Sequence, residues 1–498
     1  MAHFSRSSGI LLPIFSLPSP YGIGTLGNAA DTFIDFLHDS GAAWWQVLPV
    51  GPTGFGNSPY QSDSTYAGNP DFIDLDRLAE DGLLDREDLM GLDWGAVEDA
   101  VDYDRIHALR RPLLEKAAAA AWQRDRDLLE DFQTRTPWLT DYARFMALKQ
   151  HFAGTSWTEW PEEFRNRQPA ALERFSREHL TEMQFHVFLQ YTFFRQWARM
   201  RDYARRKGVG LIGDLPIYVA MDSADVWSDP GSFQLDENLH PTAVAGVPPD
   251  YFSEDGQLWG NPLYRWNAMQ QDGYGWWIRR IAGVETLFDV VRIDHFRGLE
   301  SYWSVPVGET TAKNGHWCKG PGLDLVRALT GWFPNLQFIA EDLGFLTPEV
   351  HQLLRDSGLP GMRILEFAFD DSDNNPYLPH NYVSNCVCYA GTHDNNTLRG
   401  WLDDAKPEEL EKAMAYWGVS QPDALPEAML RGGMRSVADL FVFQMQDLLG
   451  LDGNSRMNTP GTVGSNWNWR LSPGGLTEEL SAQLAAWNRL YGRFAPEV

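Results

Sequence analysis

Short runs of apolar residues recur along the chain and alternate with longer stretches whose apolar residues follow helical spacing. Seven of these runs have the length and the flanking turn residues of buried strands. Their alternation with helices predicts an α/β fold with a parallel sheet, and seven or eight such units in 498 residues predict a closed (β/α)8 TIM barrel. The runs are ILLPIFSLP (10–18), AAWWQVLPV (42–50), VGLIGDLPIYV (209–219), TLFDVVRID (286–294), LQFIAEDL (336–343), MRILEFAF (362–369) and NCVCYAGTHD (385–394).

The stretch NAADTFIDFLHDSG between the first two runs carries the signals of a helix. Asn28 can cap its first turn, Asp31 places a negative charge near the positive helix start, and Gly41 suits the stop. We therefore expect a helix that begins at Asn28 and ends before Gly41.

Two intervals between the predicted strands are too long to be simple connections. The first is rich in charge, tryptophan and helix-forming residues, which predicts a mostly helical insertion. The second is rich in glycine, proline and asparagine, which predicts irregular loops, and its many aromatic residues argue against disorder. We expect strands 1 and 2 within 1–70, the helical insertion at 71–180, helix 2 and strand 3 at 181–220, a loop-rich insertion bearing an active-site lid at 221–285, and strands 4 to 8 within 286–498.

Composition limits the partners that the chain can bind. Its 68 acidic residues exceed its 41 Lys and Arg, and the net charge of -27 repels nucleic-acid phosphates and anionic lipid surfaces. Three cysteines, an odd and sparse set, suit a reducing compartment better than a disulfide framework. The apolar start of the chain is too short and too rich in proline for an export signal or a membrane span. We expect a cytoplasmic protein that binds neither nucleic acid nor membranes.

Polar residues cluster where the predicted strands end, which is where parallel α/β barrels place their reacting groups. Arg292 and Asp294 are two residues apart, so they point to the same face of a strand. A carboxylate beside an arginine stays ionised, which suits a nucleophile, whereas a carboxyl group against apolar walls can keep its proton and act as a general acid. Glu341, after the apolar LQFIA, is the candidate acid. The whole set is Asp214, Arg292 with Asp294, Glu341 with Asp342, and His393 with Asp394.

Each of these residues also has a purely structural interpretation, because an aspartate beside an arginine is more often a simple ion pair. Their recurrence at successive strand ends favours a functional site, since each unpaired buried ion costs several kcal/mol. Aromatic residues mixed with amides in glycine-rich loops add a second signal. A sugar ring offers an apolar face and a rim of hydroxyls, although any one of these tryptophans could also just pack a loop. The loops are 51–70, 250–264 and 464–470.

Three other patterns do not predict a cofactor or a metal site. GIGTLG (22–27) has the glycine spacing of a dinucleotide-binding loop, but prolines interrupt the preceding strand and the next strand ends without the acidic residue. DDSDNNP (370–376) is acidic enough for Ca²⁺, but Pro376 stands where a calcium loop needs glycine, and Tyr382 where it needs glutamate. Cys386 and Cys388 with nearby His393 do not complete a zinc site. We expect no cofactor and no metal.

Six motifs occur in a specific order: GPTGFGNSPYQS, GDLPIYVA, PPDYFSEDGQLWGNPLY, RIDHFRG, AEDLG and THDNNT. In this order they resemble the 4-α-glucanotransferases of glycoside hydrolase family 77, also called amylomaltases or disproportionating enzymes, in the α-amylase superfamily. The resemblance extends from GILLPIFSLPSPYGIGTLG to GTVGSNWNWRL. It implies a (β/α)8 barrel with inserted, partly helical subdomains. It also implies a retaining transfer of α-1,4-glucan segments to the 4-hydroxyl of an acceptor glucose or glucan.

The resemblance implies roles for individual residues. Asp294 in RIDHFRG would be the nucleophile, Glu341 in AEDLG the acid and base, and Asp394 in THDNNT the carboxylate that stabilises an oxocarbenium-like sugar. The residues expected around the sugar at the cleavage point are Tyr60, Asp214, Arg292, His295 and His393. Further substrate contacts are expected from Ser58, Asp250, Trp259 and Asn466.

Two alternatives remain at this stage: a retaining α-glucan hydrolase with the same carboxylates, and a non-catalytic glucan-binding protein. Their products from pure maltotriose would differ. The segment from Gly246 to Pro262 is expected to keep water out and to offer Trp259 as a platform for the acceptor. Phe55 stands where some members of the family have a tyrosine implicated in a second glucan groove, so the presence of that groove is left open.

Overall fold

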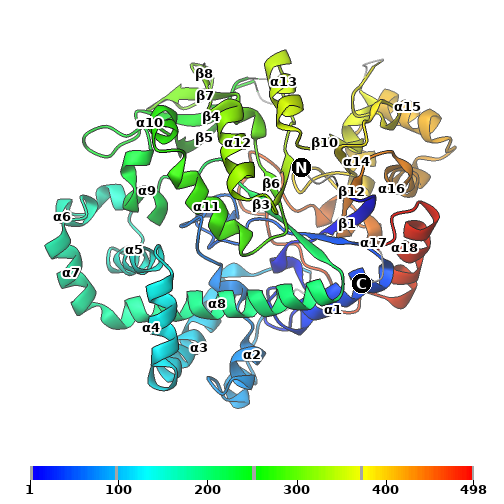
Figure 1. Ribbon diagram of the computed structural model, residues 1–498. Coiled ribbons are helices and arrows are strands. Elements are labelled where there is room, and N and C mark those ends of the chain that lie inside the picture. Colours follow the sequence, from blue (N-terminus) through cyan, green and yellow to red (C-terminus); the bar gives the residue numbers. More distant parts are fainter. Residues whose placement is uncertain (1–3, 96–98, 250–253, 371–373, 496–498) are drawn as a thin grey trace.

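Eight parallel strands close into a barrel in the computed structural model, which describes residues 4–95, 99–249, 254–370 and 374–495. Around the barrel the strands follow one another in the order β1, β12, β11, β10, β9, β6, β3, β2 (Figure 1). The predicted (β/α)8 fold is therefore confirmed. The strands are β1 (Ser7–Leu11), β2 (Trp44–Gln46), β3 (Gly210–Leu215), β6 (Val290–Ile293), β9 (Gln337–Ala340), β10 (Gly361–Ile364), β11 (Cys386–Tyr389) and β12 (Leu440–Gln444).

Two strands differ from the expectation. The first begins earlier, at Ser7, and ends at Leu11, because Pro13 lacks the N–H that a further ladder bond would need. A 3-10 helix at Ile14–Ser16 follows it. The eighth strand, Leu440–Gln444, lies where no strand was assigned from the sequence. It pairs with both β1 and β11, so it closes the barrel.

Helices surround the barrel and also fill the interval between β2 and β3. The helix α1 (Asn28–Ser40) has the expected bounds, but Gly27 is its N-cap residue and Asn28 lies inside the first turn. Gly41 ends it in the left-handed conformation, as the stop signal predicts. The other helices beside the barrel are α8 (Leu180–Arg206), α11 (Gly275–Glu285), α12 (Gly322–Trp332), α13 (Pro348–Ser357), α14 (Leu398–Asp404), α15 (Pro407–Trp417), α16 (Leu425–Arg435), α17 (Met445–Leu449) and α18 (Glu478–Leu490).

A group of helices between β2 and β3 extends to one side of the barrel, alongside the long helix α8 (Figure 1). The residues from 71 to 180 are mostly helical, in line with their composition. Whether this group is a separate subdomain with these boundaries stays a prediction. Its helices are α2 (Leu75–Glu80), α3 (Tyr103–Arg124), α4 (Arg126–Arg135), α5 (Leu139–His151), α6 (Glu162–Arg165) and α7 (Pro169–Glu178).

The interval from 220 to 285 is more regular than expected. Besides α9 (Ala224–Ser228) and α10 (Trp266–Gln271), it contains two strands of an antiparallel sheet with the order β5, β4, β7, β8. The expectation of irregular loops was wrong for these strands, because β4 pairs with β7, which follows the barrel strand β6. The pairing of β4 with β7 leaves no local signal, because more than 50 residues separate the two strands. The sheet strands are β4 (Ala243–Val247), β5 (Gln257–Pro262), β7 (Ser301–Pro306) and β8 (His316–Lys319).

Two polar side chains bond each other inside the barrel at the strand ends. The Tyr389 hydroxyl on β11 donates to Gln46 Oε1 on β2, 2.8 Å away across the barrel. Both side chains are fully buried, so their hydrogen bond satisfies groups that water cannot reach. Within the described residues, none of the helices combines the length and the apolar character of a membrane span.

Candidate active site

The centre of the site is an arginine held between two carboxylates. Strand register places Asp214 on β3 beside Arg292 on β6. Arg292 Nη1 lies 2.7 Å from both carboxylate oxygens of Asp214 and 3.1 Å from Asp294 Oδ1. Arg292 is 4% exposed. The pairing of Asp294 with Arg292 is as expected, but one guanidinium charge is shared by two carboxylates.

Glu341, at the end of β9, lies close to Asp294. Its Oε2 accepts the backbone N–H of His295, the residue directly after Asp294, at 2.7 Å. Its Oε1 accepts the N–H of Leu343, also at 2.7 Å. His295 has a left-handed backbone with φ 51°, uncommon for a residue other than glycine, and this turn aims its N–H at Glu341. The two carboxyl groups are therefore held by adjoining backbone.

Burial raises the pKa values of both carboxyl groups. For Asp294, Asp214 and Glu341 add to this rise, while Arg292 opposes it. For Glu341, Arg292 and the two backbone N–H groups oppose it, and Asp342 adds to it. Asp214 and Asp294 thus contact one guanidinium with which Glu341 also interacts electrostatically, and three neighbouring carboxyl groups cannot all ionise easily. We conclude that the pair of Asp294 and Glu341 retains one proton above the ordinary titration range of carboxylic acids.

Tyr60, His393 and Asp394 form one wall of the site. The Tyr60 hydroxyl donates to Asp214 Oδ2 at 2.8 Å, and its ring stacks on His393 with centroids 5.1 Å apart and 18° between the planes. Burial lowers the pKa of His393, which favours its neutral form. Its Nε2 lies 3.4 Å from Asp394 Oδ1, and the Asp394 side chain is 48% exposed. In this wall the partly exposed Tyr60 ring lies on the buried His393, beside an accessible carboxylate.

Three residues near this wall were not recognised in the sequence. Asn458 Nδ2 donates to Asp394 Oδ1 at 2.6 Å, and Arg456 Nη2 donates to the Asp394 carbonyl oxygen at 2.6 Å. The Trp467 ring lies 5.8 Å from that of Tyr60. Trp467 stands in the GSNWNWR loop, which was noted for its aromatic residues. Asn458 and Arg456 lie in NSRMNTPG, where no spacing distinguishes a functional residue from a turn residue.

The remaining predicted substrate residues lie outside this centre. Trp259 on β5 meets the His295 ring edge to face, with centroids 4.8 Å apart, and its Nε1 donates to Gln257 Oε1 at 3.1 Å. Ser58 Oγ accepts the Tyr60 backbone N–H at 3.3 Å, so it shapes the turn before that ring. Asn466 holds its own loop, because its Nδ2 lies 3.0 Å from the Thr462 carbonyl oxygen. Asp250 lies outside the described residues.

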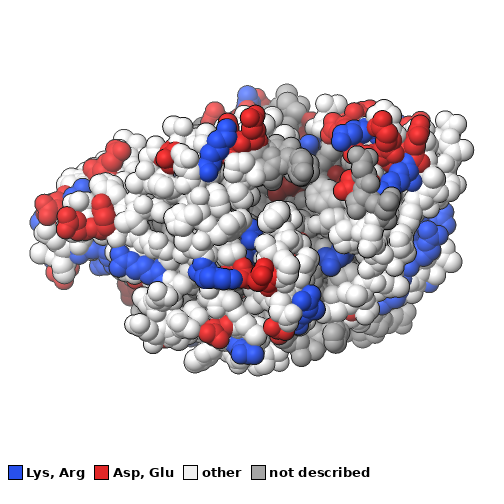
Figure 2. All heavy atoms as spheres, turned by 90° about the horizontal axis from the view of Figure 1, so that it is seen from above, with Lys and Arg blue, Asp and Glu red and all other residues white. Residues whose placement is uncertain are grey.

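Figure 2 shows acidic side chains inside a hollow on the face seen from above. Among the residues that the structure describes, no three His, Cys, Asp or Glu side chains gather as they would around a metal ion. The arrangement has one carboxyl group that can attack, a second that can exchange a proton, and a third beside a flat aromatic wall. Groups of these kinds can cleave and form glycosidic bonds.

The full length of the chain resembles known proteins. A family model described as 4-alpha-glucanotransferase matches residues 12–477. The 4-alpha-glucanotransferase of Thermus thermophilus is 47% identical in an alignment of 493 residues that covers 97% of this chain and 98% of that protein. The enzyme of that name from Clostridium butyricum is 44% identical over 483 residues, 96% and 99% of the two chains. A solved structure, amylomaltase from Streptococcus agalactiae in complex with acarbose, matches with a TM-score of 0.96 at 40% identity, covering 98% of this chain and 100% of that one.

Proposed function

The chain belongs to the 4-alpha-glucanotransferase family, and from that premise we propose how its own residues carry out the transfer. The enzyme moves a segment of an α-1,4-glucan from a donor to the 4-hydroxyl of an acceptor glucose or glucan. We propose maltooligosaccharides and α-1,4-glucans as its substrates. Two displacements, each with inversion at the anomeric carbon, give overall retention.

In the first displacement, Asp294 attacks the anomeric carbon of the donor and forms a glycosyl ester, while the glycosidic bond breaks. Arg292, 3.1 Å from Asp294 Oδ1, stabilises the ionised form of this nucleophile. Retaining enzymes place their two carboxyl groups roughly 5 to 5.5 Å apart. His295 directly follows Asp294, and its N–H donates to Glu341. This hydrogen bond supports a short distance between the carboxyl groups of Asp294 and Glu341.

Glu341 supplies the proton that the leaving sugar oxygen needs in this step. Burial raises the pKa of Glu341, which favours the protonated form that this step needs. In the second displacement the same group, now ionised, takes the proton of the acceptor 4-hydroxyl, which attacks the ester and frees Asp294. One residue thus serves both half-reactions, and no net proton is consumed.

Asp394 stabilises the positive charge that develops on the sugar ring in this proposal. It lies beside the stacked rings of Tyr60 and His393, which suit the apolar face of a sugar. Asn458 holds one of its oxygens at 2.6 Å, so the carboxylate is oriented before substrate arrives. A charge that is fixed in advance costs no reorganisation in the transition state.

The observation that carries this mechanism is the joining of Asp294, Glu341 and Arg292 by backbone and guanidinium bonds. Incubation with pure maltotriose tests the activity. Transfer yields glucose and longer maltooligosaccharides while the total of reducing ends stays nearly constant. A hydrolase with the same carboxylates would raise that total steadily, and a glucan-binding protein would leave maltotriose unchanged.

Replacing Trp259 is expected to change the balance between transfer and hydrolysis. Trp259 lies against His295, next to the reacting pair, and a sugar stacked on its ring would bring a 4-hydroxyl to Glu341. Trp259→Ala should slow transfer more than hydrolysis, so that more reducing ends appear per glucose released from maltotriose. Chromatography of the products together with a reducing-end assay measures this ratio. An unchanged ratio in a folded variant would show that Trp259 only anchors its strand.

The pH dependence should reflect the crowded carboxyl groups. Because burial raises the pKa of Glu341, the acid proton is lost at a higher pH than from an ordinary glutamate, and kcat/KM is expected to fall only above that raised pKa. Asp214→Asn removes one negative charge next to Asp294, which lowers the pKa of the pair. The alkaline limb of the kcat/KM profile should therefore move to lower pH, even though overall activity falls. An alkaline limb that stays in place or moves to higher pH would contradict the proposal that Asp294 and Glu341 share one proton.

We propose the cytoplasm as the location of this enzyme. All three cysteines, Cys318, Cys386 and Cys388, are free, which suits a reducing compartment. Burial raises the pKa of Cys388 to about 12, so this thiol is unreactive and acts as a small apolar residue.

A further inference from the structure

We propose that Arg280 on α11 is a positioning residue for the transfer reaction, acting through Thr65. Arg280 joins the segment that follows Asp214 to the loop that carries Tyr60. The inference rests on the proposed function, in which Asp214 and Tyr60 surround the sugar at the cleavage point. Neither Arg280 nor Thr65 belongs to the three carboxylates or to their direct partners.

The first side of this bridge is the chain just beyond β3. Arg280 Nη2 donates to the Pro216 carbonyl oxygen at 2.6 Å, and Nη1 donates to that of Ile217 at 3.1 Å. The Tyr264 hydroxyl donates to the same Ile217 oxygen at 2.8 Å. Pro216 is the second residue after Asp214, so these bonds fix the direction in which the chain leaves the site.

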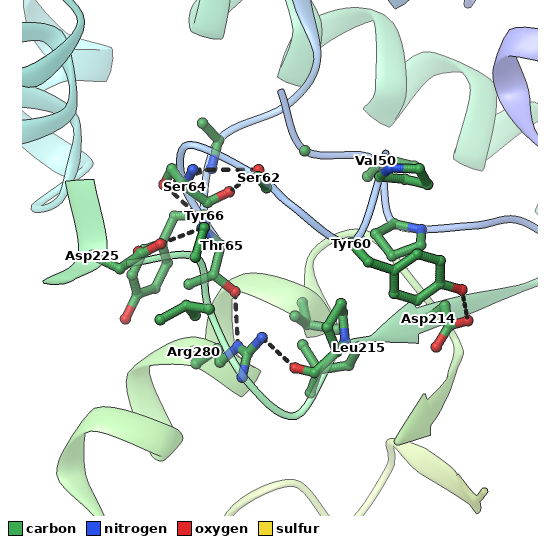
Figure 3. A pocket seen from close by; sticks show the side chains of 18 of the residues that line it. Val50, Tyr60, Ser62, Ser64, Thr65, Tyr66, Asp214, Leu215, Asp225 and Arg280 are labelled. Carbon is green, nitrogen blue, oxygen red and sulfur yellow. Dashed lines mark hydrogen bonds between the residues drawn. The ribbon is translucent and has the colours of Figure 1, made fainter. Parts of the chain in front are cut away.

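The second side is the loop between β2 and α2. Arg280 Nε donates to Thr65 Oγ1 at 2.7 Å, and Asp225 Oδ2 accepts the Thr65 backbone N–H at 2.7 Å. Figure 3 shows Thr65 between these two charged side chains, with Tyr60 on the same loop and reaching Asp214. Thr65 is thus fixed at both its hydroxyl and its backbone.

An arginine at this position makes bonds that an apolar residue cannot make. Arg280 is 2% exposed, and its guanidinium lies over the Trp276 and Trp277 rings, 5.4 and 5.0 Å from their centroids. Burying a cation is costly. Here the N–H groups of Arg280 bond two segments of the chain, one carrying Tyr60 and the other following Asp214, and these two side chains bond each other. An apolar residue could fill this volume but could not join the segments.

Loss of the bond between Arg280 and Thr65 should affect turnover more than substrate binding. If the loop is released, the Tyr60 ring can shift against His393, and the sugar at the cleavage point is misaligned with Asp294. A displacement of about 1 Å can cost roughly 100-fold in rate. Partial loosening of one hydrogen bond should cost less, whereas the binding of distant glucose units should be little affected.

Thr65→Val and Thr65→Ser provide the test, because valine keeps the shape and serine keeps the hydroxyl. With maltotriose, Thr65→Val should lower kcat about tenfold with KM changed less than twofold, and Thr65→Ser should recover most of the loss. Thr134→Val on α4 is the matched control, since the Thr134 hydroxyl donates to the Glu130 carbonyl oxygen on an exposed face. It should leave both constants unchanged.

The proposal is overturned if Thr65→Val keeps the wild-type kcat, or if Thr65→Ser loses as much activity as Thr65→Val. A fall in melting temperature that is equal for Thr65→Val and Thr134→Val, with kcat lowered only in the former, supports positioning over stability. The test changes Thr65 and not Arg280, because replacing the buried arginine would destabilise the fold as a whole. Failure of the proposed function would instead appear as retained activity in an Asp294 variant, whatever the Thr65 variants do.

Discussion

Asp294→Asn is expected to lower kcat for the disproportionation of maltotriose by roughly 10⁴-fold or more, because the covalent route loses its nucleophile. The amide cannot form the glycosyl ester. Arg292 remains paired with Asp214 at 2.7 Å, so the guanidinium is not left uncompensated. Initial rates of glucose release measure the effect.

The variant should stay folded and should keep binding maltotriose, which circular dichroism and titration calorimetry can check. Asp289→Asn is the matched control. Asp289 precedes β6, where it pairs with Arg201 and Arg205 and accepts the Leu211 N–H, outside the carboxylate centre. Its substitution should lower stability but leave kcat near the wild-type value. A folded Asp294→Asn enzyme with more than a few per cent of wild-type activity would rule out Asp294 as the nucleophile.

Asp394→Asn is the second variant with a large expected effect. Loss of a preorganised charge at a developing transition-state charge costs roughly 10²- to 10³-fold in kcat. Because the ground state carries no such charge, KM should change much less. Asp394 is half exposed and its removal leaves no buried ion, so the fold should be retained.

Asn458→Ala separates the charge of Asp394 from its orientation. This change keeps the carboxylate and removes the 2.6 Å bond from Asn458 Nδ2 that orients it. Its effect on kcat should lie between wild type and Asp394→Asn. Equal kcat values for wild type and folded Asp394→Asn would exclude the proposed role, and a larger loss for Asn458→Ala than for Asp394→Asn would show that Asn458 acts on its own.

The barrel could be predicted from the sequence because most of its buried strands appear as short apolar runs. Seven runs such as VGLIGDLPIYV combine apolar residues with turn signals at each end. The strand Leu440–Gln444 has the same character, but it runs directly into α17 at Met445, so no turn residue marks its end. The sheet of β4, β5, β7 and β8 was not predictable in this way. Its strands lie on both sides of β6, so its pairing depends on contacts that periodicity cannot show.

The acidic residues of the site were predictable because parallel strands bring their carboxyl ends together. Asp294 and Glu341 are indeed joined through the His295 N–H. The sequence could not show that Arg292 divides its charge between Asp294 and Asp214, because this depends on the register of β3 against β6. Nor could it show that Asn458 reaches Asp394, since the two are 64 residues apart.

Trapping the glycosyl ester tests most directly whether Asp294 forms the covalent intermediate. In Glu341→Gln enzyme given α-maltotriosyl fluoride, the C1–F bond can break without an acid, fluoride leaves, and a C1–O bond to Asp294 forms. Deglycosylation then lacks its base, so the ester should accumulate. After acid quenching and pepsin digestion, mass spectrometry should find the peptide containing Asp294 heavier by one maltotriosyl group. Release of fluoride with the sugar on another peptide, or with β-configured maltotriose and no adduct, would show that transfer does not pass through Asp294.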